Sequence, residues 1–309
     1  NPFRSRFDFG RLTQEHTTYI AEGGALDFYV FAGPELRGIL RRYGELTGRM
    51  PLPPLWALGH HQSRYSYYPD TLVELVADTC REHGLPLDAV YLDIHYMDGY
   101  RSFTWDRTRF PDPKALLARL QAKGVRVVTI IDPGIKYEAE GKGGYGPCDE
   151  GLAGGHFLRR RDGALYVGEV WPGAAVFPDF SRTDTRRWWG ELHRELVGAG
   201  VAGIWNDMNE PSDFRDKTGA GLMDVVFDRD GRKESYLQNR NVFGLRMSHA
   251  TYEGLLQLRP DRRPFVITRA GFAGIQRYAA TWTGDNLVGW ESLALGLSMY
   301  QSMGLSGQA

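Results

Sequence analysis

Four aspartates follow short apolar stretches of the sequence and are the first candidates for chemistry. Asp93, Asp132 and Asp207 each stand at the end of such a stretch, and Asp285 comes just after another. A carboxylate at the end of a buried strand is costly unless it is paired or used. One such residue would be ordinary, whereas four that converge on one edge of a sheet indicate a functional site.

Two carboxylates on opposite sides of a small substrate are suited to cleaving a glycosidic bond. One donates a proton to the departing oxygen, and the other attacks the anomeric carbon or positions a water molecule. Aromatic residues make up 13% of the chain, and Trp205, Trp282 and Trp290 stand near Asp207 and Asp285 in the sequence. Their flat rings can wall a sugar and exclude water, although core packing explains them equally well.

The segments that must position these acids alternate between strands and helices. We predict helices at about 70–83, 113–123, 188–196, 239–258 and 290–305, and strands at 55–59, 89–94, 125–131, 203–208, 265–268 and 279–283. A Gly-rich stretch, 134–180, is predicted to be irregular. Strands that are apolar throughout and alternate with helices indicate a parallel sheet covered on both faces. No Gly-x-Gly-x-x-Gly opens the first unit, which disfavours a dinucleotide-binding fold.

The predicted fold is therefore a (β/α)8 barrel of the α/β class that is incomplete in this chain. Six strand–helix units follow the proline-rich joint at 51–54, and residues 306–309 resemble the start of a seventh. Before the joint, 16–32 is predicted to be a hairpin around Gly23 and Gly24, and 34–48 a helix. We expect 1–50 to be the end of an N-terminal β-sandwich domain with its linking helix, and 51–309 to be the barrel. Open sheet edges favour aggregation, so we expect the missing strands to come from the same, longer polypeptide.

Composition excludes several classes of function. The formal net charge is −1, with 24% charged residues, so nucleic acid and an anionic membrane are not expected as partners. No run of the sequence approaches the ~18 apolar residues that a membrane-spanning helix needs. Two cysteines, Cys80 and Cys148, form neither a disulfide framework nor a zinc motif, and they leave the redox compartment undecided.

Five segments carry a specific resemblance. The segments are YLDIHYM at 91–97, VWPG at 170–173 with FPD at 177–179, GIWNDMNEP at 203–211, FVITR at 265–269 and TWTGDN at 281–286. In order and spacing they resemble the motifs of glycoside hydrolase family 31, the α-glucosidase family. The resemblance runs from about residue 23 to the end of the chain. It implies a retaining, exo-acting α-glucosidase that releases terminal non-reducing α-linked glucose by double displacement through a covalent glycosyl–Asp intermediate. The expected substrates are oligosaccharides or aryl and alkyl α-glycosides, and neither a metal ion nor an organic cofactor is expected.

The resemblance also implies a role for particular residues. Asp207 matches the nucleophile and Asp285 the acid/base, while Asp93 and Arg269 match residues that bind sugar hydroxyls in the −1 subsite. The residues that match the pocket lining are Trp171, Trp205, Met208, Trp282 and Ile130, and Tyr65 should lie towards the aglycone. We expect Arg269 to keep Asp207 ionised, and a neighbouring carboxylate to raise the pKa of Asp285 so that it holds its proton.

Two features depart from the family pattern. His95 stands where many members carry a second aspartate. The pocket of the family is completed by a histidine on the last barrel strands, and this chain ends before them and before the distal β-domains of the family, which we expect from the same polypeptide. The sugar and the linkage therefore stay open, so an α-xylosidase, an α-galactosidase, a sulfoquinovosidase, a transglucosidase and an α-glucan lyase remain alternatives.

Two hypotheses from other classes also remain. A metal-dependent barrel hydrolase could use His60, His61, Asp93, His95 and Asp132, although adjacent histidines on one strand point to opposite faces. A non-catalytic sugar-binding subunit on the same fold would be expected to lose one of the two acids, and both are present. Turnover of an aryl α-glucoside, with and without a chelator, separates these hypotheses from the glycosidase.

Overall fold

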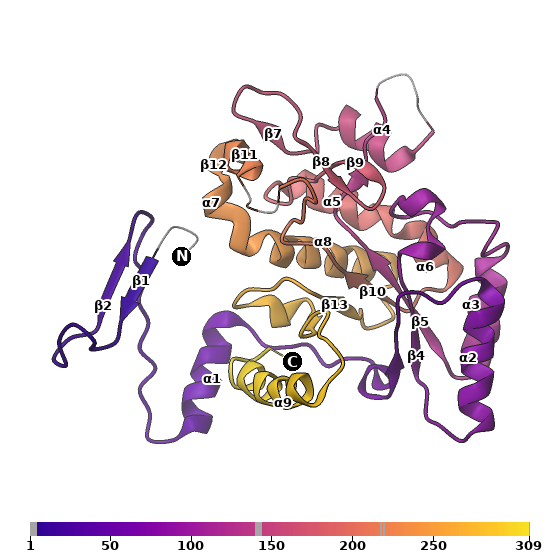
Figure 1. Ribbon diagram of the computed structural model, residues 1–309, viewed down its shortest axis with the longest axis horizontal. Helices are drawn as coiled ribbons and strands as arrows, with labels where there is room; N and C mark the ends of the chain where they lie inside the picture. Colours follow the sequence, from indigo (N-terminus) through magenta and orange to yellow (C-terminus); the bar gives the residue numbers. More distant parts are fainter. Residues whose placement is uncertain (1–4, 140–143, 217, 219, 309) are drawn as a thin grey trace.

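A computed structural model describes residues 5–139, 144–216, 218 and 220–308. Its centre is a sheet of six parallel strands in the order β14-β13-β10-β5-β4-β3 (Figure 1). These strands are β3 (His61–Gln62), β4 (Ala89–Leu92), β5 (Arg126–Ile131), β10 (Gly203–Asn206), β13 (Val266–Thr268) and β14 (Ala280–Thr281). Because neighbours in the sheet are also neighbours along the chain, the sheet has the order of a barrel wall. The predicted incomplete (β/α)8 barrel is confirmed.

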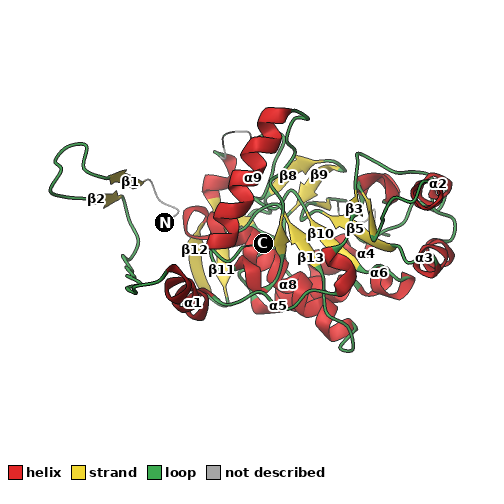
Figure 2. Ribbon diagram, turned by 90° about the horizontal axis from the view of Figure 1, so that it is seen from below, coloured by secondary structure: helices red, strands yellow, loops and turns green. Residues whose placement is uncertain are grey.

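Helices follow the strands, and those between residues 70 and 258 lie along the outside of the sheet (Figure 2). The helices that follow the strands are α2 (Asp70–Glu82), α3 (Pro113–Ala122), α5 (Thr183–Leu192), α6 (Arg194–Ala199), α8 (Phe243–Leu258) and α9 (Trp290–Leu305). The start of α3 shows why that helix begins where it does. Oδ1 of Asp112 accepts a hydrogen bond from the backbone N–H of Ala115 at 2.9 Å, and Pro113 occupies the first turn. A capped end with proline at the first helical position is the pattern that the sequence predicts.

Helices α5 and α8 lie side by side on the outer face of the sheet (Figure 1, Figure 2). Their closest approach is at Gly190 and Gly254, where an added Cβ at Gly254 would lie 2.4 Å from Cα of Gly190. Both neighbours are backbone atoms, so neither helix can yield without a shift of the other. The two glycines therefore set how closely α8 approaches α5.

We predict that Gly254→Ala destabilises the protein by about 1–3 kcal/mol, because overpacking at a backbone contact forces the helices apart. Gly198→Ala is the matched control, since Gly198 also lies in a helix but has open space around it. The control should be neutral or slightly stabilising, because alanine favours helix. Thermal unfolding of both variants provides the measurement. Equal melting temperatures would show that the α5–α8 contact does not depend on the glycines.

Two expectations about residues 1–62 are wrong. The first strand is β3 at 61–62, and residues Leu55–Leu58 instead form a 3-10 turn after Pro54. The opening hairpin pairs β1 (Ser5–Asp8) with β2 (Thr18–Ala21), and it stands away from the barrel sheet in both views (Figure 1, Figure 2). Oδ1 of Asp8 accepts hydrogen bonds from the N–H groups of Gly10 and Arg11. The chain therefore turns directly after β1, and not at Gly23 and Gly24 as predicted. Residues 25–33 form no strand; helix α1 (Leu36–Thr47) follows.

The stretch 134–180 is also more regular than predicted, in the part that the structure describes. It contains α4 (Gly146–Ala153) and a three-stranded antiparallel sheet of β6 (Ile135–Lys136), β9 (Gly173–Val176) and β8 (Val167–Val170). A second antiparallel sheet joins β7 (Arg159–Arg160) to β11 (Val225–Arg229) and β12 (Arg232–Ser235), before α7 (Tyr236–Asn239). Strands of two to five residues are too short to show a hydrophobic periodicity, so the sequence pattern does not predict them.

Helix α9 leaves much apolar surface uncovered. Its exposed large side chains include Trp290, Leu293, Leu295, Leu297 and Tyr300. The preceding loop adds Leu287 and Val288. A helix that is apolar on most of its surface is normally buried in a protein. Among the described residues, no helix is long and apolar enough to span a membrane.

Candidate active site

The register of the sheet brings four of the candidate side chains together. Strands β5, β10, β13 and β14 share one row of paired residues, made of Ile131, Asn206, Thr268 and Thr281. Successive side chains of a strand point to opposite faces, so the residue after each of these points into the barrel. Those next residues are Asp132, Asp207, Arg269 and Trp282. Asp93 follows β4 and lies beside Ile130, two residues below Asp132 and therefore on the same face of the sheet.

Asp207 is enclosed and meets a guanidinium group. Its side chain is 10% exposed, and its Oδ1 lies 3.1 Å from Nη1 of Arg269, in ion-pair contact without an aligned hydrogen bond. Burial raises the pKa of Asp207 to about 6, although Arg269 and the backbone N–H of Met208 act in the opposite direction. Arg269 therefore favours the ionised form, as expected from the sequence, but burial has the larger effect.

Glu210 holds Arg269 in place and was missed by the sequence analysis. Nε and Nη2 of Arg269 donate to the two carboxylate oxygens of Glu210 at 2.9 and 3.0 Å, and the hydroxyl of Ser212 donates to Oε2 at 2.7 Å. Although burial raises the pKa of Glu210, the hydrogen bonds from Arg269 and Ser212 hold it below its usual range. A two-point contact fixes the orientation of a guanidinium. Glu210 stands in the same GIWNDMNEP segment as Asp207, but nothing in that segment indicates its contact with Arg269.

Two further carboxyls lie beside this pair. Oδ1 of Asp93 accepts a hydrogen bond from the N–H of Ile94 at 2.7 Å, and burial raises the pKa of Asp93 to about 6. Asp132 is 5% exposed, and its Oδ1 is enclosed without a hydrogen-bond partner among the described residues. Burial, then Asp207 and Asp93, raise the pKa of Asp132 well above its ordinary value.

Aromatic and apolar side chains surround the carboxyls on the barrel side. Trp205 meets Trp282 edge to face, with ring centroids 5.5 Å apart. Ile130 is 1% exposed and pairs with Trp205 across the sheet. Met208 has a positive φ of 53° and turns its sulfur to within 3.1 Å of Nη2 of Arg269. These four predicted lining residues are therefore close to Asp207 and Arg269.

Tyr65 and Trp171 form a separate, more open group with His95. The ring of Tyr65 lies 5.0 Å from that of His95 and 6.4 Å from that of Trp171, and the two side chains are 61% and 40% exposed. His95 stacks on Tyr68 at 4.8 Å, and its Nδ1 lies 3.1 Å from the hydroxyl of Ser66. Burial and the nearby Arg109 lower the pKa of His95. Aromatic side chains thus surround His95, the position at which the family pattern has a second aspartate.

Asp285 faces the same guanidinium but from an open loop. Its Oδ2 lies 3.9 Å from Nη1 of Arg269, the nitrogen that also contacts Asp207. Its side chain is 82% exposed, and the following residues Leu287 and Val288 are exposed as well. The described residues therefore do not enclose Asp285.

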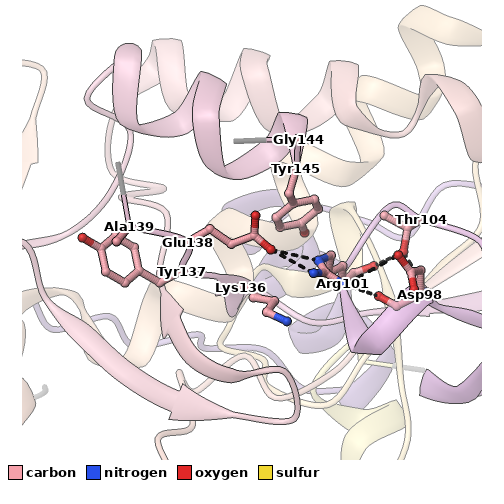
Figure 3. A pocket seen from close by; sticks show the side chains of 9 residues that line it. All are labelled: Asp98, Arg101, Thr104, Lys136, Tyr137, Glu138, Ala139, Gly144 and Tyr145. Carbon is pink, nitrogen blue, oxygen red and sulfur yellow. Dashed lines mark hydrogen bonds and ion pairs between the residues drawn. The ribbon is translucent and has the colours of Figure 1, made fainter. Parts of the chain in front are cut away.

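A pocket of about 600 Å³ opens between the loops that follow β4 and β5 (Figure 3). Arg101 and Glu138 form an ion pair at 2.9 Å across it, and Lys136, Tyr137 and Tyr145 contribute to its walls. The hydroxyl of Tyr145 donates to the carbonyl of Ser102, and the hydroxyl of Ser102 donates to the carbonyl of Asp132. The pocket wall therefore supports the backbone at the end of β5.

The histidines proposed as metal ligands have other contacts. Nδ1 of His61 lies 2.9 Å from the hydroxyl of Tyr91, and its ring stacks near Trp56. Within the described ranges, no three side chains of His, Cys, Asp or Glu are grouped as a metal site would require.

Comparison with known proteins places the chain among carbohydrate-active enzymes. Residues 50–309 match the family model "Glycosyl hydrolases family 31 TIM-barrel domain". The chain is 51% identical over its whole length to "Alpha-glucosidase 2" of Bacillus thermoamyloliquefaciens, and 40% identical over 97% of its length to "Alpha-glucosidase" of Saccharolobus solfataricus. It spans 38% and 45% of these relatives. A crystal structure of a GH31 dextranase from Flavobacterium johnsoniae, complexed with glucose, superposes on 99% of the chain with a TM-score of 0.89 and 27% identity, and 37% of that protein is covered.

Proposed function

Because the chain belongs to glycosyl hydrolase family 31, we propose that the protein is a retaining, exo-acting α-glucosidase. The proposed substrates are oligosaccharides with a terminal non-reducing α-linked glucose, and aryl or alkyl α-glucosides. One observation carries the proposal, namely that the carboxyls of Asp207 and Asp285 converge on a single nitrogen of Arg269. Such convergence suits the separation of about 5–5.5 Å at which retaining pairs work. The alpha-glucosidase relatives support the choice of glucose.

In the proposed mechanism, Asp207 attacks the anomeric carbon and the glycosidic bond breaks. Asp285 donates its proton to the departing oxygen, which leaves a covalent glycosyl–Asp207 ester. Asp285 then accepts a proton from water, the water oxygen attacks the anomeric carbon, and the carboxylate of Asp207 is released. The ester forms on the strand end beside Trp205, where burial keeps bulk water away.

Binding of the terminal sugar is assigned to the groups around Asp207. Asp93 and Arg269 offer an acceptor and donors for sugar hydroxyls, and Trp205, Trp282, Ile130 and Met208 supply apolar walls. Tyr65 and Trp171, whose rings are exposed, are proposed to meet the leaving group. No metal ion or organic cofactor takes part in this scheme, because carboxyl side chains perform both steps.

The remaining part of the barrel is proposed to cover the open side of the sheet. The edge strand β14 and the exposed apolar face of α9 would pack against further strands and helices of the same polypeptide. We also propose that 1–50, with the β1–β2 hairpin and α1, is the end of an N-terminal β-sandwich domain, and that 51–309 belong to the catalytic barrel. The experiments below therefore use the full-length enzyme.

We predict an acid limb of kcat/KM near pH 6. Asp207 must be ionised to attack, its pKa is raised to about 6 by burial, and activity is therefore lost as the pH falls through that value. Below it, kcat/KM should fall about tenfold per pH unit. A pH profile with an aryl α-glucoside provides the measurement. A limb near the ordinary aspartate value of about 3.9 would show that the enclosure of Asp207 does not govern catalysis.

A panel of aryl α-glycosides tests the proposed function itself. Glucosides should be cleaved with the highest kcat/KM, and xylosides, galactosides and sulfoquinovosides should be poorer substrates. Free glucose should be the sugar product, since an unsaturated anhydro-sugar would identify a lyase. Transfer of glucose to a second sugar in preference to water would identify a transglucosidase. If the full-length enzyme turned over none of the panel, the sugar-binding alternative would replace the proposal.

A further inference from the structure

We propose that Asp132 is a positioning residue that keeps its proton while Asp207 is ionised, and that its O–H group orients the carboxylate of Asp207. The inference rests on the proposed function, because it concerns the nucleophile of the same site. It begins from the register of the sheet. Ile131 and Asn206 are paired, so Asp132 and Asp207 are the next residues on adjacent strands, in the same row and on the same face.

Neither solvent nor a hydrogen-bond donor among the described residues stabilises a negative charge on the enclosed Oδ1 of Asp132. The side chain is 5% exposed, and its enclosed Oδ1 has no hydrogen-bond partner in the described part of the chain. Two hydroxyl groups lie near but are committed elsewhere. Tyr96 donates to the carbonyl of Ile130 at 2.9 Å, and Ser102 donates to the backbone carbonyl of Asp132 at 3.0 Å. A buried carboxylate without donors is far more costly than a buried carboxylic acid.

Most of the charged groups that act on Asp132 also disfavour its ionisation, whereas Arg269 favours it. These groups are Asp207 and Glu210 after β10, Asp93 after β4, and Arg269 after β13, that is, three carboxyls and one cation. Tyr96 is the remaining titratable neighbour, and its hydroxyl is buried. Arg269 directs Nε and Nη2 to Glu210 and Nη1 to Asp207. The cation thus contacts Glu210, Asp207 and Asp285, and no ion pair joins it to Asp132 among the described residues.

The loop beside the strand fixes the backbone of Asp132. Its carbonyl accepts from Ser102, whose own carbonyl accepts from Tyr145 at 2.9 Å, and Arg101 is paired with Glu138 across the pocket (Figure 3). Asp132 is therefore held in the row beside the nucleophile. A protonated acid there can donate to Asp207 without adding a negative charge that would oppose ionisation of Asp207.

Three variants of the full-length enzyme test the inference. Asp132→Asn retains a neutral donor, so kcat/KM should fall by no more than about tenfold, with the acid limb at the wild-type pH. Asp132→Leu removes the donor and should lose about tenfold more than the asparagine variant. The infrared carbonyl absorption of protonated carboxylic acids, recorded above pH 7, should lose one band in Asp132→Asn, while any band of Asp285 remains. The same band should persist in Asp213→Asn, the matched control, because Asp213 is equally enclosed but accepts hydrogen bonds from Tyr166 and Glu169.

Two results would overturn the inference. An acid limb that moves to lower pH by about one unit in Asp132→Asn would show that a negative charge had been removed. A protonated-acid band that is absent from the wild type, or unchanged in Asp132→Asn, would show that Asp132 does not carry the proton. The infrared readout does not depend on turnover. If the wild-type enzyme cleaved no α-glucoside, the proposed function would be rejected. The infrared bands would still show whether Asp132 is protonated.

Discussion

Replacing Asp207 by Ala is expected to abolish turnover of every α-glycoside that the enzyme accepts. The covalent intermediate cannot form without the carboxylate, and loss of a nucleophile lowers kcat by at least about 10⁴-fold. The expectation rests on position as well as on residue type. Asp207 ends a strand of the central sheet, is 10% exposed on its side chain, and lies 3.1 Å from a guanidinium that Glu210 holds in place.

The measurement is kcat for an aryl glucoside and for an oligosaccharide, with a control carboxylate changed in the same way. Asp261→Ala is that control, because Asp261 is 76% exposed and contacts only Arg262 among the ion pairs of the described residues. It should match the wild type. Residual turnover above about 1% in Asp207→Ala, for both substrates and in protein free of wild type, would remove Asp207 from the role of nucleophile.

Replacing Asp285 by Ala should have the second-largest effect, and the effect should depend on the leaving group. An alkoxide leaves poorly without a proton, so oligosaccharides should lose about 10²–10⁴-fold in kcat/KM, whereas an activated aryl glucoside should lose much less. Azide needs no deprotonation to attack the glycosyl–Asp207 ester. Added azide should therefore restore turnover of the aryl glucoside and give the α-glucosyl azide, because it enters from the face that water would use.

The position of Asp285 sharpens this test. It lies on an open loop, 3.9 Å from the nitrogen of Arg269 that contacts Asp207. If Asp285→Ala lost the same factor on every leaving group and azide restored nothing, Asp285 would be a contributor to binding and another acid would be required. Asn286→Ala, one residue along the same exposed loop, controls for a general disturbance of the loop.

The sequence predicts the site largely because strand ends carry the chemistry. Apolar strands that each end in an acid place Asp93, Asp132 and Asp207 at one mouth once the strands are parallel, and the register confirms that juxtaposition. Parallel strands buried on both faces are continuous apolar runs, which is why β5 was predicted within one residue. The type of each helix or strand, and their order along the chain, can thus be predicted from the hydrophobic pattern of the sequence alone.

What the sequence did not predict depends on tertiary contacts. The two-point contact between Glu210 and Arg269 joins segments that follow different strands, and no local pattern marks it. Burial raises the pKa of Asp207 more than Arg269 lowers it, a balance that only the packed site decides. Strand β3 has two residues, so its alignment with β4 is fixed by pairing and not by propensity.

The anomeric form of the first sugar released tests the account most directly. Two displacements at the anomeric carbon, the first by Asp207 and the second by water, return the configuration of the substrate. Proton NMR during early hydrolysis of an α-glucoside by the full-length enzyme should therefore show α-glucose first, with the β-anomer appearing only as mutarotation proceeds. β-Glucose as the first product would mean a single displacement by water, and would contradict the assignment of Asp207 as a nucleophile.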